Sequence, residues 1–130
     1  MQTQNKNEKF DWGEPVNVYT SENATEDGIL VETKIFEKRI TNLNKLPFSH
    51  VTVNLLTTCG YMTETEKDGV KFNIPCLIDL FVQAYKIGAR GTKGDWFYSG
   101  KIELPSGKKQ EIFIAQNETG KFTIMLPEDY

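Results

Sequence analysis

Three stretches between residues 96 and 126 alternate apolar and polar side chains with the period of a β-strand. They cover residues 96–104, 110–115 and 122–126, and Pro105-Ser106-Gly107-Lys108 and Asn117-Glu118-Thr119-Gly120 separate them. Side chains of a strand point alternately to its two faces, so this pattern predicts strands that are buried on one face. Since short glycine-containing turns join them, we expect a three-stranded antiparallel meander. Its apolar face consists of Trp96, Tyr98, Ile102, Leu104, Ile112, Ile114, Phe122, Ile124 and Leu126.

The strongest helix signal lies just before the meander. Asn73 suits the N-terminal cap, Pro75 suits the first turn, and Gly88 and Gly91 mark the end. The apolar face between these signals is broad, which predicts burial against a sheet. The meander is the only predicted sheet of sufficient size. The apolar face of the helix consists of Leu77, Leu80, Phe81, Ala84, Tyr85 and Ile87.

The first 33 residues carry shorter signals. Residues 1–9 are polar and predict a flexible N-terminal arm, which leaves a single domain over residues 10–130. Residues 15–19 are extended in character. Thr20 or Ser21 could cap a brief helical turn that Gly28 ends, and the β-branched residues that follow predict a strand at 29–33.

Three central segments are harder to assign. The apolar spacing at residues 34–42 predicts a short helix, and the polar residues 61–71 predict a loop or an excursion from the main fold. Residues 49–59 fit two structures equally well. They alternate as a strand does, while Ser49 and Gly60 stand where the caps of a helix would.

Composition limits the classes of function. The net charge is −3 and the basic residues are scattered, whereas a nucleic-acid surface gathers them on one face, so direct nucleic-acid binding is not indicated. No apolar run reaches the roughly 18 residues that cross a bilayer, and no signal peptide is evident. Cys59 and Cys76 have apolar neighbours and form no CxxC motif, which indicates buried free thiols in the cytoplasm. We expect no cofactor.

The glycine-rich, basic loop at residues 88–94 is the best candidate for small-ligand binding. A phosphate-binding loop precedes a helix, whereas this loop follows one, so a flexible connection is the simpler interpretation. Even so, Arg90 and Lys93 beside Trp96 and Tyr98 could hold an anion or a base by charge and stacking.

Catalytic and metal-binding chemistry has few candidates. His50 is the only histidine, and on a continuous helix it would lie roughly 13 Å from Cys59, too far for a catalytic pair. The spacing of the carboxylates, Asp79 and Asp95 among them, forces no metal site. We therefore predict no catalytic and no metal-binding residues, and a metal-dependent enzyme that uses Asp79 is the weakest alternative.

The closing residues Glu128, Asp129 and Tyr130 have two interpretations. The simpler one is a solvated acidic tail. The other is a partner-binding end, in which a rigid strand presents an acidic and aromatic surface to a basic partner.

Several motifs follow one another across nearly the whole ordered chain: Tyr19-Thr20, residues 24–31, residues 48–56, a helix at residues 75–84, and residues 123–129. In this order they resemble an uncharacterised family, formally a domain of unknown function, of small proteins from phages, plasmids and other mobile elements of bacteria. The resemblance implies a helix at residues 49–59. It implies no activity, cofactor or site residue.

Together these observations predict an α+β fold, with the C-terminal meander and a short N-terminal strand packed on two or three helices. The resemblance and the missing catalytic motifs favour a non-enzymatic accessory protein that binds and modulates a host protein, for example a component of a defence system. The alternative is a protein that binds or sequesters a nucleotide-like ligand. A second copy of the chain could also pair along the exposed edge of the meander.

Overall fold

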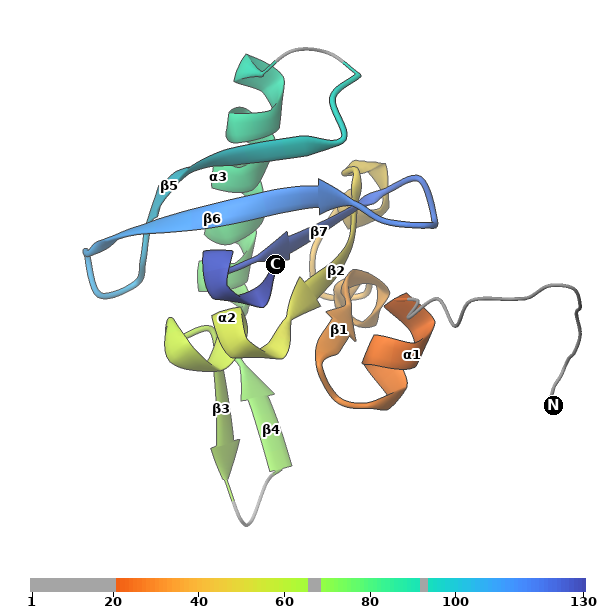
Figure 1. The fold of residues 1–130 in the computed structure, drawn as a ribbon. Coiled ribbons are helices and arrows are strands. Elements are labelled where there is room, and N and C mark those ends of the chain that lie inside the picture. Colours follow the sequence, from red (N-terminus) through yellow and green to blue (C-terminus); the bar gives the residue numbers. More distant parts are fainter. Residues whose placement is uncertain (1–20, 66–68, 92–93) are drawn as a thin grey trace, which may run out of the picture.

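The computed structural model describes residues 21–65, 69–91 and 94–130, and these form an α+β structure around one central sheet (Figure 1). The sheet has five strands in the order β1-β2-β7-β6-β5. The predicted arm at residues 1–9 and the extended segment at 15–19 lie outside the described residues. The strands of the sheet are β1 (Leu30–Glu32), β2 (Phe48–Thr52), β5 (Phe97–Glu103), β6 (Lys109–Gln116) and β7 (Phe122–Met125).

The predicted meander is present and forms one half of the sheet. Tyr98 lies opposite Ile114, and Ile114 lies opposite Ile124, so the apolar residues of β5, β6 and β7 share one face. β7 also pairs with β2 in parallel, and β2 pairs with β1 antiparallel. The α+β class is therefore confirmed, but the sheet is larger than predicted and mixed in direction.

Helix α3 (Ile74–Arg90) begins as predicted. The Asn73 side chain accepts a hydrogen bond from the backbone N–H of Cys76 at 3.3 Å, and Pro75 occupies the first turn. The helix does not stop at Gly88 but continues to Arg90, with Gly91 as its C-cap.

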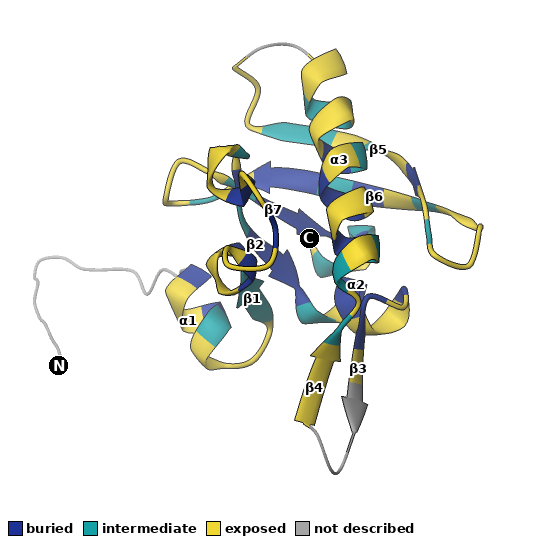
Figure 2. Cartoon of the chain, turned by 180° about the vertical axis from the view of Figure 1, so that it is seen from behind, coloured by how far each residue is buried: buried dark blue, intermediate teal, exposed yellow. Residues whose placement is uncertain are grey.

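α3 lies across one face of the sheet, here called the inner face, and turns its opposite side to solvent (Figure 2). It approaches β5 closely at Gly100, where an added Cβ would lie 2.9–3.2 Å from the side chain of Ile87. Tyr85 was predicted on the buried face, but it is 51% exposed, so that assignment is wrong. The buried side chains of α3 are Leu77, Leu80, Phe81 and Ala84.

The predicted helix at residues 49–59 is wrong in its first half. Residues 48–52 form β2, and the helix α2 covers only Val53–Thr58. Its N-cap is Thr52, whose hydroxyl accepts a hydrogen bond from the backbone N–H of Leu55 at 3.3 Å. Pairing with the distant strand β7 decides the conformation, because it satisfies the backbone of β2 at long range.

Two other central predictions are also wrong. In place of a helix at residues 34–42, the chain forms two short 3-10 turns, η1 (Thr33–Phe36) and η2 (Leu43–Lys45), and Asn42 between them has a left-handed backbone with φ 65°. In place of a loop at residues 61–71, β3 (Met62–Thr65) and β4 (Gly69–Phe72) form a separate hairpin. By contrast, the predicted helical turn α1 (Ser21–Glu26) and the strand β1 are confirmed.

The outer face of the sheet, opposite α3, is covered only in part. α1 lies beside β1, and the C-terminal 3-10 turn η3 (Pro127–Asp129) lies in front of the middle strands (Figure 1). The side chains that β5 and β6 point toward this outer face are therefore more accessible to solvent than those on the inner face. Among the described residues, no helix combines the length and apolar character that crossing a membrane requires.

Candidate functional site

Four aromatic side chains, here called the aromatic cluster, gather on the outer face of β5 and β6: Trp96, Phe97, Phe113 and Tyr130. The ring centroid of Phe97 lies 5.6 Å from that of Trp96, 4.9 Å from that of Phe113 and 5.2 Å from that of Tyr130. These separations are typical of interacting aromatic pairs. Trp96 is 59% exposed and Tyr130 is 66% exposed, so the cluster presents a large apolar area to solvent.

A hydrogen-bonded turn places Tyr130 in this cluster. The Asp129 carboxylate accepts hydrogen bonds from the Thr52 hydroxyl at 2.8 Å, the Asn54 side chain at 3.0 Å and the backbone N–H of Leu126 at 3.2 Å. The chain end is therefore folded onto the sheet, and the interpretation as a solvated tail is wrong. Of the three residues predicted to bind a partner, Asp129 anchors the turn and Tyr130 joins the aromatic cluster.

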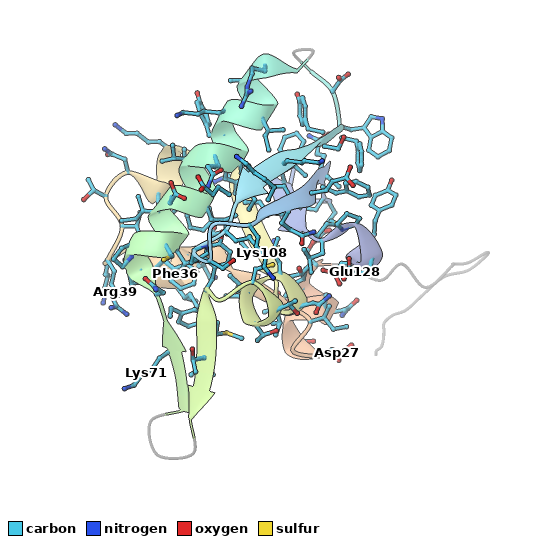
Figure 3. The ribbon with its side chains drawn as sticks, turned by 90° about the vertical axis from the view of Figure 1, so that its left-hand side faces the viewer. Asp27, Phe36, Arg39, Lys71, Lys108 and Glu128 are labelled. Atoms are coloured by element: carbon cyan, nitrogen blue, oxygen red, sulfur yellow. The ribbon has the colours of Figure 1, made fainter. Side chains whose placement is uncertain are left out.

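Glu128, the third of these residues, is exposed at the same turn. It lies on the side of the sheet opposite α3 (Figure 3), two residues before Tyr130 of the aromatic cluster. Its carboxylate gives this surface a negative charge at one border.

The aromatic cluster lies beside an edge strand. β5 has a sheet neighbour on one side only. At one end, the Gln83 side chain accepts from the backbone N–H of Glu103 at 2.8 Å and donates to its carbonyl at 2.9 Å, so α3 caps the edge there. By the alternation of backbone groups along a strand, Phe97, Ser99 and Lys101 turn their N–H and C=O groups toward the same free edge. The edge therefore offers backbone groups next to exposed aromatic rings.

The aromatic cluster was only partly foreseen from the sequence. Trp96 was predicted both on the buried face of the meander and beside the basic loop, and its place on the buried face is wrong, because it is 59% exposed and contacts Phe97. Phe97 and Phe113 were overlooked. The alternation of apolar and polar residues could have revealed both of them. Phe97 and Phe113 are large apolar residues at positions where this pattern expects solvent-facing side chains. Large apolar residues at such positions indicate a surface with a binding role.

The structure separates the residues of the predicted ligand-binding loop. Arg90 and Tyr98 line a common cavity of about 440 Å³, together with Asp95 and Lys101. Trp96 is turned toward Phe97 in the aromatic cluster instead. Lys93, the remaining residue of that prediction, lies outside the described residues.

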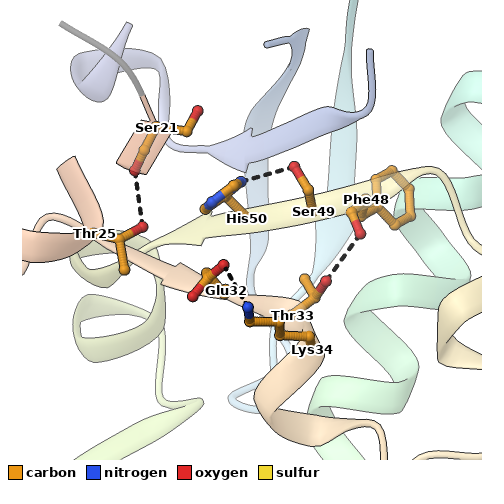
Figure 4. Close-up of polar contacts among 8 residues, drawn as sticks. All are labelled: Ser21, Thr25, Glu32, Thr33, Lys34, Phe48, Ser49 and His50. Atoms are coloured by element: carbon orange, nitrogen blue, oxygen red, sulfur yellow. Dashed lines mark hydrogen bonds and ion pairs between the residues drawn. The ribbon is translucent and has the colours of Figure 1, made fainter. Parts of the chain in front are cut away.

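A polar network around β2 was not predicted. Phe48 pairs with Phe122 and His50 pairs with Thr123, so Ser49 is an extra residue that forms a bulge. The Ser49 hydroxyl lies 2.7 Å from His50 Nδ1 (Figure 4). It also accepts a hydrogen bond from the Asn117 side chain at 2.8 Å. The predicted helix at residues 49–59 placed His50 in its first turn, whereas His50 is a buried residue of β2, 5% exposed.

Burial of His50 makes a testable prediction about pH. Burial lowers the pKa of its imidazole below the ordinary value of 6.5, although the nearby Glu32 and Glu118 carboxylates act in the opposite direction. The unfolded chain then binds more protons than the folded chain, so the free energy of unfolding should fall as the pH drops below 6.5. Denaturant titrations at a series of pH values measure this fall.

The variant His50→Gln identifies the titrating group. It should remove most of the pH dependence just below 6.5, because Gln does not titrate there. Glu118 stays ionised in that window: burial alone would raise its pKa, but hydrogen bonds from its own backbone N–H and from Ser21 outweigh burial and lower it. An unchanged pH profile in His50→Gln would contradict the assignment.

The other candidate residues form no reactive centre within the described parts of the chain. No three His, Cys, Asp or Glu side chains there gather closely enough to hold a metal ion. Asp79 accepts a hydrogen bond from Gln83 at 2.7 Å and so helps to hold the cap on β5. Cys59 and Cys76 are free, and burial raises the pKa of the Cys59 thiol, which keeps it protonated.

Comparisons with models of protein families, with curated proteins and with solved structures found no match to this chain.

Proposed function

We propose that this chain is a non-enzymatic protein that binds another protein through the aromatic cluster. The observation that carries the proposal is the exposure of Trp96 and Tyr130 above Phe97 and Phe113, on the open face of an edge strand. Trp and Tyr contribute most to binding at protein interfaces, because they bury a large area at low entropic cost. A contiguous aromatic surface of this kind is unusual on a chain with no partner.

The kind of partner follows from the same surface and from the resemblance. Free backbone groups along β5 fit an extended segment of a partner, which would add a strand to the sheet while its side chains contact the rings. The resemblance to proteins of phages and other mobile elements suggests a host protein, for example a component of a defence system. The expected compartment is the cytoplasm.

The experiment begins with capture of the partner on the tagged chain from a bacterial host, followed by its purification. We expect the double variant with Trp96→Ala and Tyr130→Ala to lose at least about 2 kcal/mol of binding free energy, roughly a 30-fold rise in Kd by calorimetry. The matched control is Ile35→Ala, because Ile35 is 52% exposed and lies in η1, away from the cluster. Equal affinity of the double variant and the control would reject the proposal.

A second candidate function is binding of a nucleotide-like ligand in the cavity of about 440 Å³ at the end of α3. Arg90 and Lys101 supply positive charge there, and the Tyr98 ring supplies a flat surface. We expect ATP to raise the melting temperature of the parent chain but not of Arg90→Ala. Lys108→Ala removes a comparable charge from the distant β5–β6 hairpin (Figure 3) and should leave the shift unchanged. The same shift in both variants would reject this candidate.

A further inference from the structure

α3 carries a second apolar stripe that the sheet does not cover, here called the α3 seam. Its members occur at alternating intervals of three and four residues, which is the spacing of a coiled-coil seam. Ile78 is 41% exposed, Val82 is 44% exposed and Tyr85 is 51% exposed, while the buried stripe faces the sheet. The α3 seam consists of Pro75, Ile78, Val82, Tyr85 and Ala89, all of them exposed.

The charges beside the α3 seam point to its occupant. Asp79 and Lys86 are both exposed and lie on the same flank of the seam, seven residues or about 10 Å apart along the axis. In a parallel pair of α3 helices, the flanks that carry Asp79 and Lys86 lie on opposite sides of the contact, so neither charge meets a charge of the other copy. In an antiparallel pair, Asp79 of each copy faces Lys86 of the other, and this pairing occurs twice. The surface is therefore complementary to itself under two-fold symmetry.

The sizes of the seam residues also fit an antiparallel pair of α3 helices. When Val82 lies opposite Tyr85 of the second copy, Ile78 lies opposite Ala89 of that copy. Ala89 and Tyr85 line an apolar cavity of about 390 Å³ between α3 and the sheet, which also reaches Phe122. A large side chain thus meets a small one next to a cavity that can accept it.

We propose that two copies of this chain form a two-fold dimer in which their α3 helices pair antiparallel along the α3 seam. Phe97 and Phe113 of the aromatic cluster point away from the face that α3 covers (Figure 2), so the dimer leaves both clusters accessible. The proposal is independent of the protein-binding function and would hold if that function failed.

The test is sedimentation velocity on the purified full chain over a wide range of concentrations. We expect a reversible dimer whose dissociation constant rises at least about 100-fold in Val82→Asp, because the substitution places a charge in the apolar seam of each copy. Val82 is exposed in the single chain, so its fold should be kept, and circular dichroism checks this. Ile35→Asp, an equivalent change in η1, should leave the dimer intact.

Charge reversal then tests the antiparallel arrangement. Lys86→Glu alone should weaken the dimer about tenfold, since each new Glu faces an Asp. Adding Asp79→Lys to the same chain should restore it, because opposite charges face each other again. This substitution also removes the hydrogen bond from Gln83, so circular dichroism checks that the fold is kept. A parent chain that is monomeric at all concentrations would overturn the proposal and leave the seam for a helix of another protein. A double variant as weak as Lys86→Glu would also overturn it.

Discussion

Replacing Ile124 with alanine should lower the free energy of unfolding by about 4 kcal/mol, the largest loss we expect from a single substitution. Ile124 is fully buried in β7, the central strand of the sheet. It lies opposite Val51 of β2 on one side and Ile114 of β6 on the other. The substitution therefore leaves a cavity where both halves of the sheet meet α3. Denaturant unfolding followed by circular dichroism measures the loss.

Ile35→Ala is the control for this prediction. It removes the same atoms from a side chain that is 52% exposed, so the free energy of unfolding should change by no more than about 0.5 kcal/mol. Similar losses in the two variants would mean that β7 is not the packed centre of the sheet.

Asp129→Ala should cost about 2–3 kcal/mol of unfolding free energy, because it removes the acceptor of three hydrogen bonds. The O–H of the buried Thr52 would lose its acceptor, although its oxygen still accepts from Leu55, and the backbone N–H of Leu126 would lose its acceptor too. Release of η3 would also free Tyr130 from Phe97 and Phe113. The expected result is a lower melting temperature together with weaker partner binding.

Glu128→Ala separates this effect from simple loss of charge. Glu128 is the adjacent carboxylate, is exposed, and has no hydrogen bond to another described residue. Its replacement changes the net charge by the same amount and should leave the melting temperature within about a degree of the parent. Equal destabilisation by the two substitutions would contradict the role of Asp129 as an anchor.

Local sequence signals were sufficient to predict those elements whose structure depends on strands adjacent in sequence or on helix caps. The turns at Gly107 and Gly120 have left-handed backbones and connect sequence neighbours, so the meander could be predicted. α3 could be predicted for the same kind of reason, because Asn73 and Pro75 fix its start. These features depend on residues only a few positions apart.

Long-range pairing explains most of what the sequence did not reveal. β2 is a strand because β7, more than 70 residues later, pairs with it in parallel. The local signals did not decide this, because the alternation fitted a strand while Ser49 and Gly60 fitted the caps of a helix. The bulge at Ser49 depends on the same pairing. The network of His50 and Asn117 could not be foreseen, because it joins segments on either side of this pairing.

The sequence was sufficient to single out several residues of the candidate sites, but not to predict which of them lie together. The exposed Trp96 and Tyr130 were both singled out, but on different grounds and for different ligands. Their contact with Phe97 depends on η3 folding back over the sheet, which the hydrogen bonds of Asp129 with Thr52 and Asn54 determine. The apolar stripe on the solvent side of α3 was hidden because Tyr85 was assigned to the buried face.

The central position of β7 has a consequence for synthesis of the protein. β7 separates β2 from β6, so neither the pair β1–β2 nor the pair β5–β6 has its full set of neighbours before β7 has emerged from the ribosome. Until then, apolar residues of both pairs, such as Val51 and Ile114, lack the strand that covers them. We expect the nascent chain to need protection by chaperones up to that point, and folding to follow translation of β7 in a single late step.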